Sequence, residues 1–551
     1  MVNIMGKKDN KDGFIVQASI LAATGIICRI IGLLYRSPLT SVIGDEGNGY
    51  YSNAYNMYAI ILLISSYSIP SAVSKVIAER LALRQYKNAH RIFKCALIYV
   101  VIVGGIFSLF TFFGAKWLVP KSSVVVLRIF APTIFFSGLL GVLRGYFQAH
   151  GTMVQTSFSQ IIEQILNAVV SIGAAYMFTQ AVADKDHTTR AVYGAAGSAL
   201  GTGAGVLIAL IFMYLIYLLN RNYIRSRIAK DRRKEVDSYQ HIFQIIFLMV
   251  TPVILSTFIY NSSTVVNQKI YHMILKAEFH MPSAVIASNY GVFGGKTTVI
   301  MNIPIALASA MAAAMIPMIS GSYATGDEEE TNNKIQTGIR TTMLISIPCS
   351  VAMFVLPKEV VGFLFPQKES LVLAADLLRV LSVSVIFYAL STLTNGVLQG
   401  IGKVNVPMIN AAVALIVQTV VLVAVLYLGL GLFGLALAMN VYSFVMCVLN
   451  QVSIRKYLGY GLDIIETFIK PLIASFVMGA IAWGSYYLFS LVMPIGNYSL
   501  KNRVCLTFTI VIAMVAYFAI VLKMKILDEE DMRTLPKGNL LIRAAKKLRL
   551  L

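Results

Sequence analysis

The sequence predicts an all-α polytopic membrane protein of about fourteen transmembrane helices, built as two parallel six-helix lobes followed by two C-terminal helices. Of its 551 residues 57% are hydrophobic and only 13% are charged, whereas soluble proteins carry about 25% charged residues. Apolar runs of about 20 residues, long enough to cross a bilayer as a helix, recur throughout the chain. The alternating pattern of a β-barrel is absent, since 95–115 and 195–219 are continuously apolar.

The predicted spans follow one another in order. They lie near 14–38, 51–79, 95–115, 123–147, 154–180, 193–220, 241–267, 289–320, 338–357, 376–398, 404–428, 430–454, 470–493 and 503–523. The first contains Arg29 and is followed by no small-residue cleavage site, so we expect it to be retained rather than removed as a signal peptide. An even number of spans places both termini on one side. Basic loops at 80–94 and 221–234 predict that this side is cytoplasmic.

Two similar segments indicate an internal repeat. Residues 144–151 end the fourth span and 395–402 end the tenth, and the shared positions keep a constant offset of 251: Gly145, Gln148 and Gly151 match Gly396, Gln399 and Gly402. Two related halves of six helices each therefore share one orientation, as in transporters that rock about a central cavity. The predicted organisation is an N-lobe at 1–220, a basic cytoplasmic linker at 221–240, a C-lobe at 241–457, spans 13 and 14 within 458–523, and a basic cytoplasmic tail at 524–551.

A few ionisable residues fall inside the predicted spans, where charge is costly and marks pathways or partners. Arg29 and Arg36 lie seven residues apart, so a continuous helix would place them on one face. Arg144 and Lys296 lie near span ends, and Glu163 is the only carboxylate well inside a span. A guanidinium matches phosphate oxygens with a planar fork, so these four cations predict a cavity for a diphosphate head group.

Local alternatives stay open for two of the cations. Arg29 either lines the cavity or pairs with Glu163, and Arg144 either faces the cavity or extends to the head groups. Gln148, Gln399 and Glu163 are expected as polar or structural partners in the cavity.

Nothing in the sequence predicts an active site. Serine-hydrolase, zinc-protease and nucleotide-binding motifs are absent, and the five cysteines are scattered singly. Basic patches interleaved with aromatic residues, which are typical of nucleic-acid binders, are also missing. We therefore predict a transporter rather than an enzyme, with no cofactor, no catalytic residue, no metal centre and no nucleic-acid partner.

Residues 29–36, with Arg29, Gly32 and Arg36, resemble the first span of the MurJ-like flippases, and 144–151 followed by 159–164 is similar to their SpoVB branch. Both belong to the multidrug/oligosaccharidyl-lipid/polysaccharide exporter superfamily. The resemblance implies a two-lobed cell-membrane protein that alternates between inward- and outward-open states. It also implies transfer of lipid II, the undecaprenyl-diphosphate-linked peptidoglycan precursor, to the outer leaflet. The arginine spacing departs from MurJ by one residue, which affects the equivalence of Arg36.

The same resemblance implies partners. These are a lipid-linked oligosaccharide substrate, a coupling cation and a cell-wall polymerase, with Asn261, Asn410 and Asn440 as sodium candidates. Anionic membrane lipids are expected at the basic tail.

Three other functions remain open at the level of sequence. One is a flippase for a different polyprenyl-linked polysaccharide. Another is a cation-coupled multidrug antiporter, which favours an acidic cavity. The last is a membrane-embedded glycosyltransferase or polymerase, which needs a catalytic carboxylate.

Overall fold

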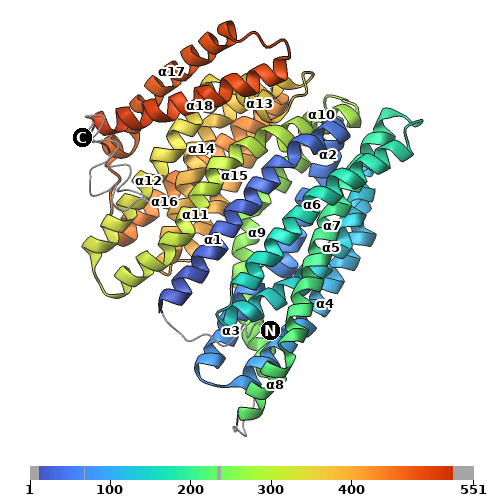
Figure 1. The fold of residues 1–551 in the computed structure, drawn as a ribbon, viewed down its shortest axis with the longest axis vertical. Helices are drawn as coiled ribbons and strands as arrows, with labels where there is room; N and C mark the ends of the chain where they lie inside the picture. The colour runs from blue at the N-terminus through green and yellow to red at the C-terminus, as the bar shows by residue number, and fades with distance from the viewer. Residues whose placement is uncertain (1–10, 68, 232–236, 525, 527–551) are drawn as a thin grey trace. The chain divides into compact units, whose positions relative to one another are not determined.

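The computed structural model describes residues 11–67, 69–231, 237–524 and 526 (Figure 1). Within these residues every regular element is a helix and no strand occurs, in agreement with the predicted fold class. The chain divides into two compact units, Met1–Gly291 and Val292–Leu551, called unit 1 and unit 2 below. The predicted lobes 1–220 and 241–457 and the linker 221–240 stay predictions, and nearly all of the predicted tail 524–551 lies outside the described residues.

Unit 1 is a bundle of long helices in which α6 packs along α7, α5 packs on α4 and α7, and α1 packs on α6. Its helices are α1 (Lys11–Leu34), α2 (Arg36–Leu62), α3 (Ile69–Ala82), α4 (Tyr86–Leu118), α5 (Val124–Ala149), α6 (Val154–Ala181), α7 (His187–Leu219), α8 (Arg221–Lys230), α9 (Tyr239–Ala277) and α10 (Ser283–Val292). A π-helical turn, η1 (Leu63–Tyr67), separates α2 from α3, and a 3-10 turn, η2 (Lys121–Ser123), precedes α5.

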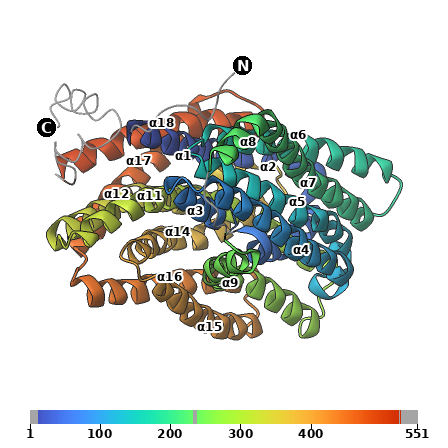
Figure 2. The same cartoon turned by 90° about the horizontal axis from the view of Figure 1, so that it is seen from below.

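Unit 2 is built around α14, which contacts α11, α12 and α16. Figure 2 shows α15 beside α16 and α17 beside α18, which are also contacting pairs. The helices are α11 (Thr298–Ala324), α12 (Glu328–Val355), α13 (Pro357–Leu364), α14 (Leu371–Gly400), α15 (Asn405–Tyr427), α16 (Gly431–Leu458), α17 (Lys470–Val492) and α18 (Tyr498–Lys523). Two further π-helical turns are η3 (Phe293–Thr297), before α11, and η4 (Ile465–Ile469), before α17.

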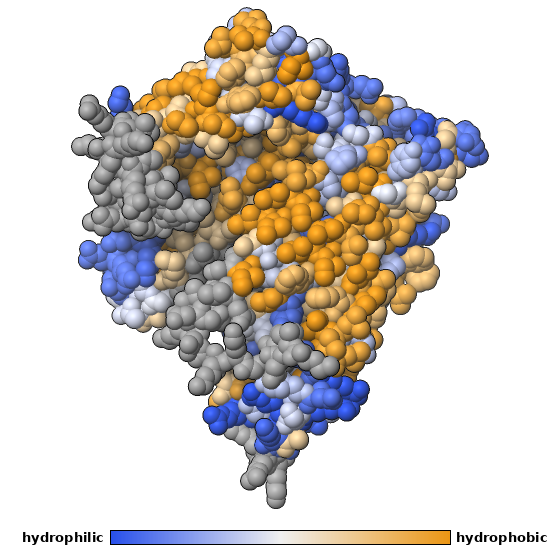
Figure 3. All heavy atoms as spheres, in the orientation of Figure 1, coloured by the Kyte–Doolittle hydropathy of each residue, from blue (hydrophilic) through white to orange (hydrophobic). Residues whose placement is uncertain are grey.

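The described helices fit a membrane. Eleven are long and apolar enough to cross one, or twelve if the bent pair 23–34 and 36–66 forms one span. The predicted count of about fourteen therefore stays a prediction. In Figure 3, apolar side chains cover the middle of the visible helices, while hydrophilic residues gather around the α6–α7 connection and the α8 end. This is the distribution expected for helices whose middles face hydrocarbon and whose ends face water.

The first predicted span is not one continuous helix, which corrects the expectation that Arg29 and Arg36 share a face. The chain bends by 46° between Ala23–Leu34 and the segment that begins at Arg36. Pro38 lies in the first turn of α2, and its ring cannot donate a hydrogen bond to the carbonyl of Leu34. The helix therefore ends there, and Arg36 begins a new one. A second kink follows at Gly44, whose φ of 69° suits glycine alone.

The internal repeat appears as two helix–turn–helix segments with matching turns, α5–α6 and α14–α15, called hairpins below. Their helices end at Ala149 and Gly400 and restart at Val154 and Asn405, each pair 251 residues apart. Gly151 and Gly402 have φ of 75° and 78°. The amide of Gly151 donates to the Gln148 carbonyl and that of Gly402 to the Gln399 carbonyl, at 2.9 and 3.0 Å. The predicted matches thus mark one helix cap used twice, in which a left-handed residue satisfies the last carbonyls.

Helix α9 is joined to α2 and α10 by side-chain hydrogen bonds. The Asn56 amide donates to Gln268 Oε1 at 2.7 Å and to the Tyr290 hydroxyl at 3.0 Å. Gln268 donates to the backbone carbonyl of Asn53, and His272 Nε2 lies 3.1 Å from Asn53 Oδ1. Amides of this kind hold helices together inside membranes, so α9 and α10 are fastened to unit 1.

Candidate functional site

An ion pair bridges α5 and α6 in unit 1. Nη2 of Arg144 donates to Oε2 of Glu163 at 2.7 Å, and Nε donates to the Ser159 hydroxyl at 2.9 Å. Ser159 and Glu163 lie one helical turn apart, so both point to the same side of α6. Arg144 and Ser159 each lie five residues from the hairpin turn, which brings them opposite one another. The side chains of Arg144 and Glu163 are 15% and 22% exposed, so the pair is mostly buried but still reachable.

This pairing decides between two alternatives that the sequence left open for Arg29. Glu163 pairs with Arg144, because the α5–α6 turn places the two residues opposite one another, and the cavity-lining role of Arg29 stays a prediction. Cys28, the neighbour of Arg29 on α1, lies within electrostatic reach of both Arg144 and Glu163. The Arg29 side chain itself is exposed. Helix α1 therefore lies beside the Arg144–Glu163 pair.

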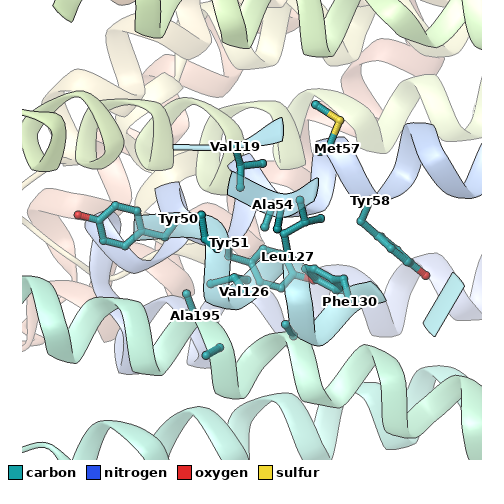
Figure 4. Close-up of a cluster of buried hydrophobic side chains, with 14 of the residues drawn as sticks. Tyr50, Tyr51, Ala54, Met57, Tyr58, Val119, Val126, Leu127, Phe130 and Ala195 are labelled. Atoms are coloured by element: carbon teal, nitrogen blue, oxygen red, sulfur yellow. The ribbon is translucent and has the colours of Figure 1, made fainter. Parts of the chain in front are cut away.

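Arg36 is surrounded by aromatic rings. Its guanidinium carbon lies 5.1 Å from the ring centre of Tyr51 and 5.8 Å from that of Tyr35. Tyr51 stacks on Tyr55 at 5.7 Å. Figure 4 shows the buried cluster that supports these rings, and within it Tyr58 stacks on Phe130 at 4.7 Å.

The aromatic faces around Arg36 attract the cation. Across the described part of the chain no carboxylate forms an ion pair with Arg36. An aromatic setting without a carboxylate keeps the charge of Arg36 available to an anion.

Lys296 belongs to unit 2 and is almost fully buried, at 1% exposure. It lies in the η3 turn, and its ammonium donates to the Ser370 hydroxyl at 2.6 Å. Its predicted contact with substrate stays a prediction, because in this structure the ammonium is enclosed.

In unit 2, a neutral amide cluster lies at the repeat positions that match Arg144 and Ser159 of unit 1. Asn395 and Asn410 lie 251 residues after Arg144 and Ser159. Both bind the fully buried Asn450 of α16, whose Nδ2 donates to Asn395 Oδ1 at 2.8 Å and whose Oδ1 accepts from Asn410 at 2.9 Å. The amide of Asn450 also donates to the Thr394 hydroxyl at 3.0 Å.

The remaining predicted residues are spread over both units. Gln148 is half-buried and Gln399 is exposed. Of the sodium candidates, Asn410 is committed to the amide cluster, Asn440 donates to the Val380 carbonyl at 2.9 Å, and Asn261 is half-buried on α9. Asn261 belongs to unit 1 and the other two to unit 2, and their role as sodium ligands stays a prediction.

Comparison with known proteins decides the family. The model of the family described as "Lipid II flippase MurJ" matches residues 90–501, most of the chain. The chain belongs to the MurJ family. It is 22% identical to Stage V sporulation protein B of Bacillus subtilis, over 97% of this chain and 100% of that protein. It is 21% identical to the lipid II flippase MurJ of the same organism, over 84% and 86%.

Solved structures agree on the fold. A lipid II flippase MurJ in an inward closed conformation gives a TM-score of 0.64, with 14% identity over 91% of this chain and 97% of that chain. An inward-facing multidrug transporter of the MATE family gives 0.58, with 17% identity over 79% and 98%. The protein is thus a multi-pass membrane transporter of the lipid-flippase type and not an enzyme.

Sequence reasoning missed the groups that surround the predicted cations. Ser159 carried no assigned role, although it lies one turn before Glu163. Tyr51 and Tyr55 lie on the same helix as Arg36, beyond the kink at Gly44. Their helical spacing of four was a usable signal. Asn450 was missed as well, although an amide in the middle of an apolar span usually has a partner.

Proposed function

We propose that this MurJ-family protein transfers lipid II from the inner to the outer leaflet by alternating access. A diphosphate is too costly to bring into hydrocarbon unaided, so the protein must replace its hydration with cations. Arg36 carries the proposal, because its guanidinium lies against tyrosine rings and no carboxylate among the described residues forms an ion pair with it. Arg29, Arg144 and Lys296 are the other proposed contacts for the diphosphate, with Gln148 and Gln399 as polar groups of the cavity.

The proposal includes an orientation and partners. Both termini are cytoplasmic in the cell membrane, because that places the basic segments 80–94 and 221–234 on the inside. We propose that anionic lipids bind these basic surfaces, that a cation couples transport, and that a cell-wall polymerase receives the product.

A second candidate is a flippase for another polyprenyl-linked polysaccharide. It is favoured by the match to a sporulation protein along nearly the whole chain. A multidrug antiporter is less well supported, because cationic drugs call for an acidic site, whereas Glu163 is already paired with Arg144.

The experiment is rescue of bacteria depleted of their own MurJ-type flippase. Growth is recorded together with the amount of lipid II cleaved by an enzyme added outside the cells. We expect the wild type to restore both, and Arg36→Ala, inserted at equal level, to restore neither.

A matched control is Arg190→Ala, which removes an exposed arginine that forms no described side-chain bond; it should behave as the wild type. A well-inserted wild type that exposes no lipid II would contradict the proposal and favour another polyprenyl-linked substrate.

A further inference from the structure

The carboxylate of Glu163 is the main obstacle to an anion that approaches Arg144. Two of the guanidinium's donors are in use, one on Glu163 and one on Ser159. A diphosphate needs the same planar fork. Three N–H donors of Arg144 remain, and an anionic head group bound to them competes with Glu163 for the same positive charge and places like charges side by side; this step rests on the proposed function.

Among the residues that the structure describes, Arg144 is the one cation that pairs with Glu163. The groups around it come from every helix packed against α6. On α5 the charged group is Arg144. On α1 the titratable group that interacts with Glu163 is Cys28, the neighbour of Arg29. On α2 the titratable groups are Tyr55 and Tyr58.

The last neighbour, α7, contributes backbone, since Gly205 lies against the Glu163 carbonyl. Within the described residues no titratable side chain of α7 interacts with Glu163. Apart from Arg144, the titratable groups that interact electrostatically with Glu163 are a thiol and two phenols.

A carboxylate that loses its only ion partner in a site of low polarity is unstable as an anion. Protonation stabilises such a carboxylate, because the neutral acid avoids the free-energy cost of burying a charge. The side chain is 22% exposed, so water has a route to it.

We propose that Glu163 is a proton-binding site linked to the occupancy of Arg144 by a diphosphate. As phosphate oxygens take the guanidinium donors, a proton from the surrounding water binds the freed carboxylate. When the head group leaves, the proton returns to water and the Arg144–Glu163 pair forms again. The charge added by the ligand is thereby partly balanced inside unit 1.

The test is calorimetric titration of the purified full-length protein with farnesyl diphosphate, in buffers of different ionisation enthalpy at neutral pH. The dependence of the binding heat on the buffer gives the number of protons taken up. We expect about one proton per bound ligand for the wild type, and none for Glu163→Gln, which keeps the shape of the side chain and does not titrate. Glu79→Gln, at an exposed carboxylate of α3, should match the wild type.

A second readout follows the group itself. Infrared difference spectra should show a protonated carboxyl band appearing when farnesyl diphosphate is added to the wild type, and no such band for Glu163→Gln. A purely structural Glu163 would give no band in either protein.

Equal proton uptake by the wild type and Glu163→Gln would overturn the proposal. So would no uptake by the wild type, or no binding of the probe. Failure of the proposed function looks different, because it appears as absent lipid II exposure in cells that produce the wild-type protein.

Discussion

The α5–α6 hairpin of unit 1 and the α14–α15 hairpin of unit 2 share a backbone and differ in the chemistry between their helices. Both end in the same glycine cap and restart at the same offset. In unit 1 the facing positions hold Arg144 and Ser159, with Glu163 one turn further on. In unit 2 the matching positions hold Asn395 and Asn410, joined through Asn450.

The comparison shows that the turn and the polar groups beside it are under different constraints. The turn requires a glycine with positive φ in both units, so its sequence can change little. The polar groups differ with what each unit must hold: the described positions beside the turn are charged in unit 1 and neutral amides in unit 2. We infer that unit 1 handles the anionic part of the substrate, whereas the amide cluster of unit 2 holds three helices together.

The largest expected effect comes from breaking the ion pair. Arg144→Ala leaves Glu163 without its partner, and such losses cost about 3–5 kcal/mol in a buried site. Because the pair is partly exposed, we expect about 3 kcal/mol, measured as the free energy of unfolding in detergent. Arg190→Ala should change it by less than about 0.5 kcal/mol.

The charge swap Arg144→Glu with Glu163→Arg tests whether the pair acts as a unit. The double variant restores opposite charges, so it should recover about half of the loss caused by either single change. Unfolding free energies of the two single variants and the double variant complete the cycle. A double variant as unstable as the sum of the singles would show that the two residues do not depend on each other.

Asn450→Leu tests the amide cluster of unit 2. It removes the donor to Oδ1 of Asn395 and leaves the Asn410 amide with only its 3.3 Å bond to the Ser453 hydroxyl, which should lower the free energy of unfolding by about 2 kcal/mol. Lipid exposure in cells should stay near the wild-type level, since no charge is lost. Asn405→Ala, at an exposed residue on the same hairpin, is the control. Loss of lipid exposure by a stably inserted Asn450→Leu would assign the cluster a role in transport.

The smallest effect concerns the shared cap. Gly151→Ala and Gly402→Ala each force alanine into the left-handed region, at a cost of about 1 kcal/mol. The two losses should be equal, because the caps are equivalent. Gly173→Ala, at a helical glycine with open space around it, should be neutral or slightly stabilising. A cost at only one of the two caps would argue against a shared backbone.

The sequence was enough for the helical membrane fold and for the repeat, because hydropathy and glycine caps are local signals. It was not enough for the break before Arg36, since a proline such as Pro38 can either kink a continuous helix or lie in the first turn of a new one, and the sequence does not distinguish the two. The partner of Glu163 also required the structure, because the register of α5 against α6 is set by the turn. The repeat offset of 251 applied to Ser159 would have pointed to Asn410, but nothing local points to Asn450.

The most direct test of the account compares the two hairpins in the same cells. Arg144→Lys keeps a positive charge beside Glu163 but removes the planar fork, whereas Asn395→Ser changes the matching position of unit 2. Externally cleavable lipid II is measured per molecule of inserted protein in cells depleted of their own flippase. We predict about a tenfold loss for Arg144→Lys, the value of one charge-assisted hydrogen bond, and a change below about twofold for Asn395→Ser. Equal losses, or a larger loss for Asn395→Ser, would contradict the assignment of the anionic substrate to unit 1.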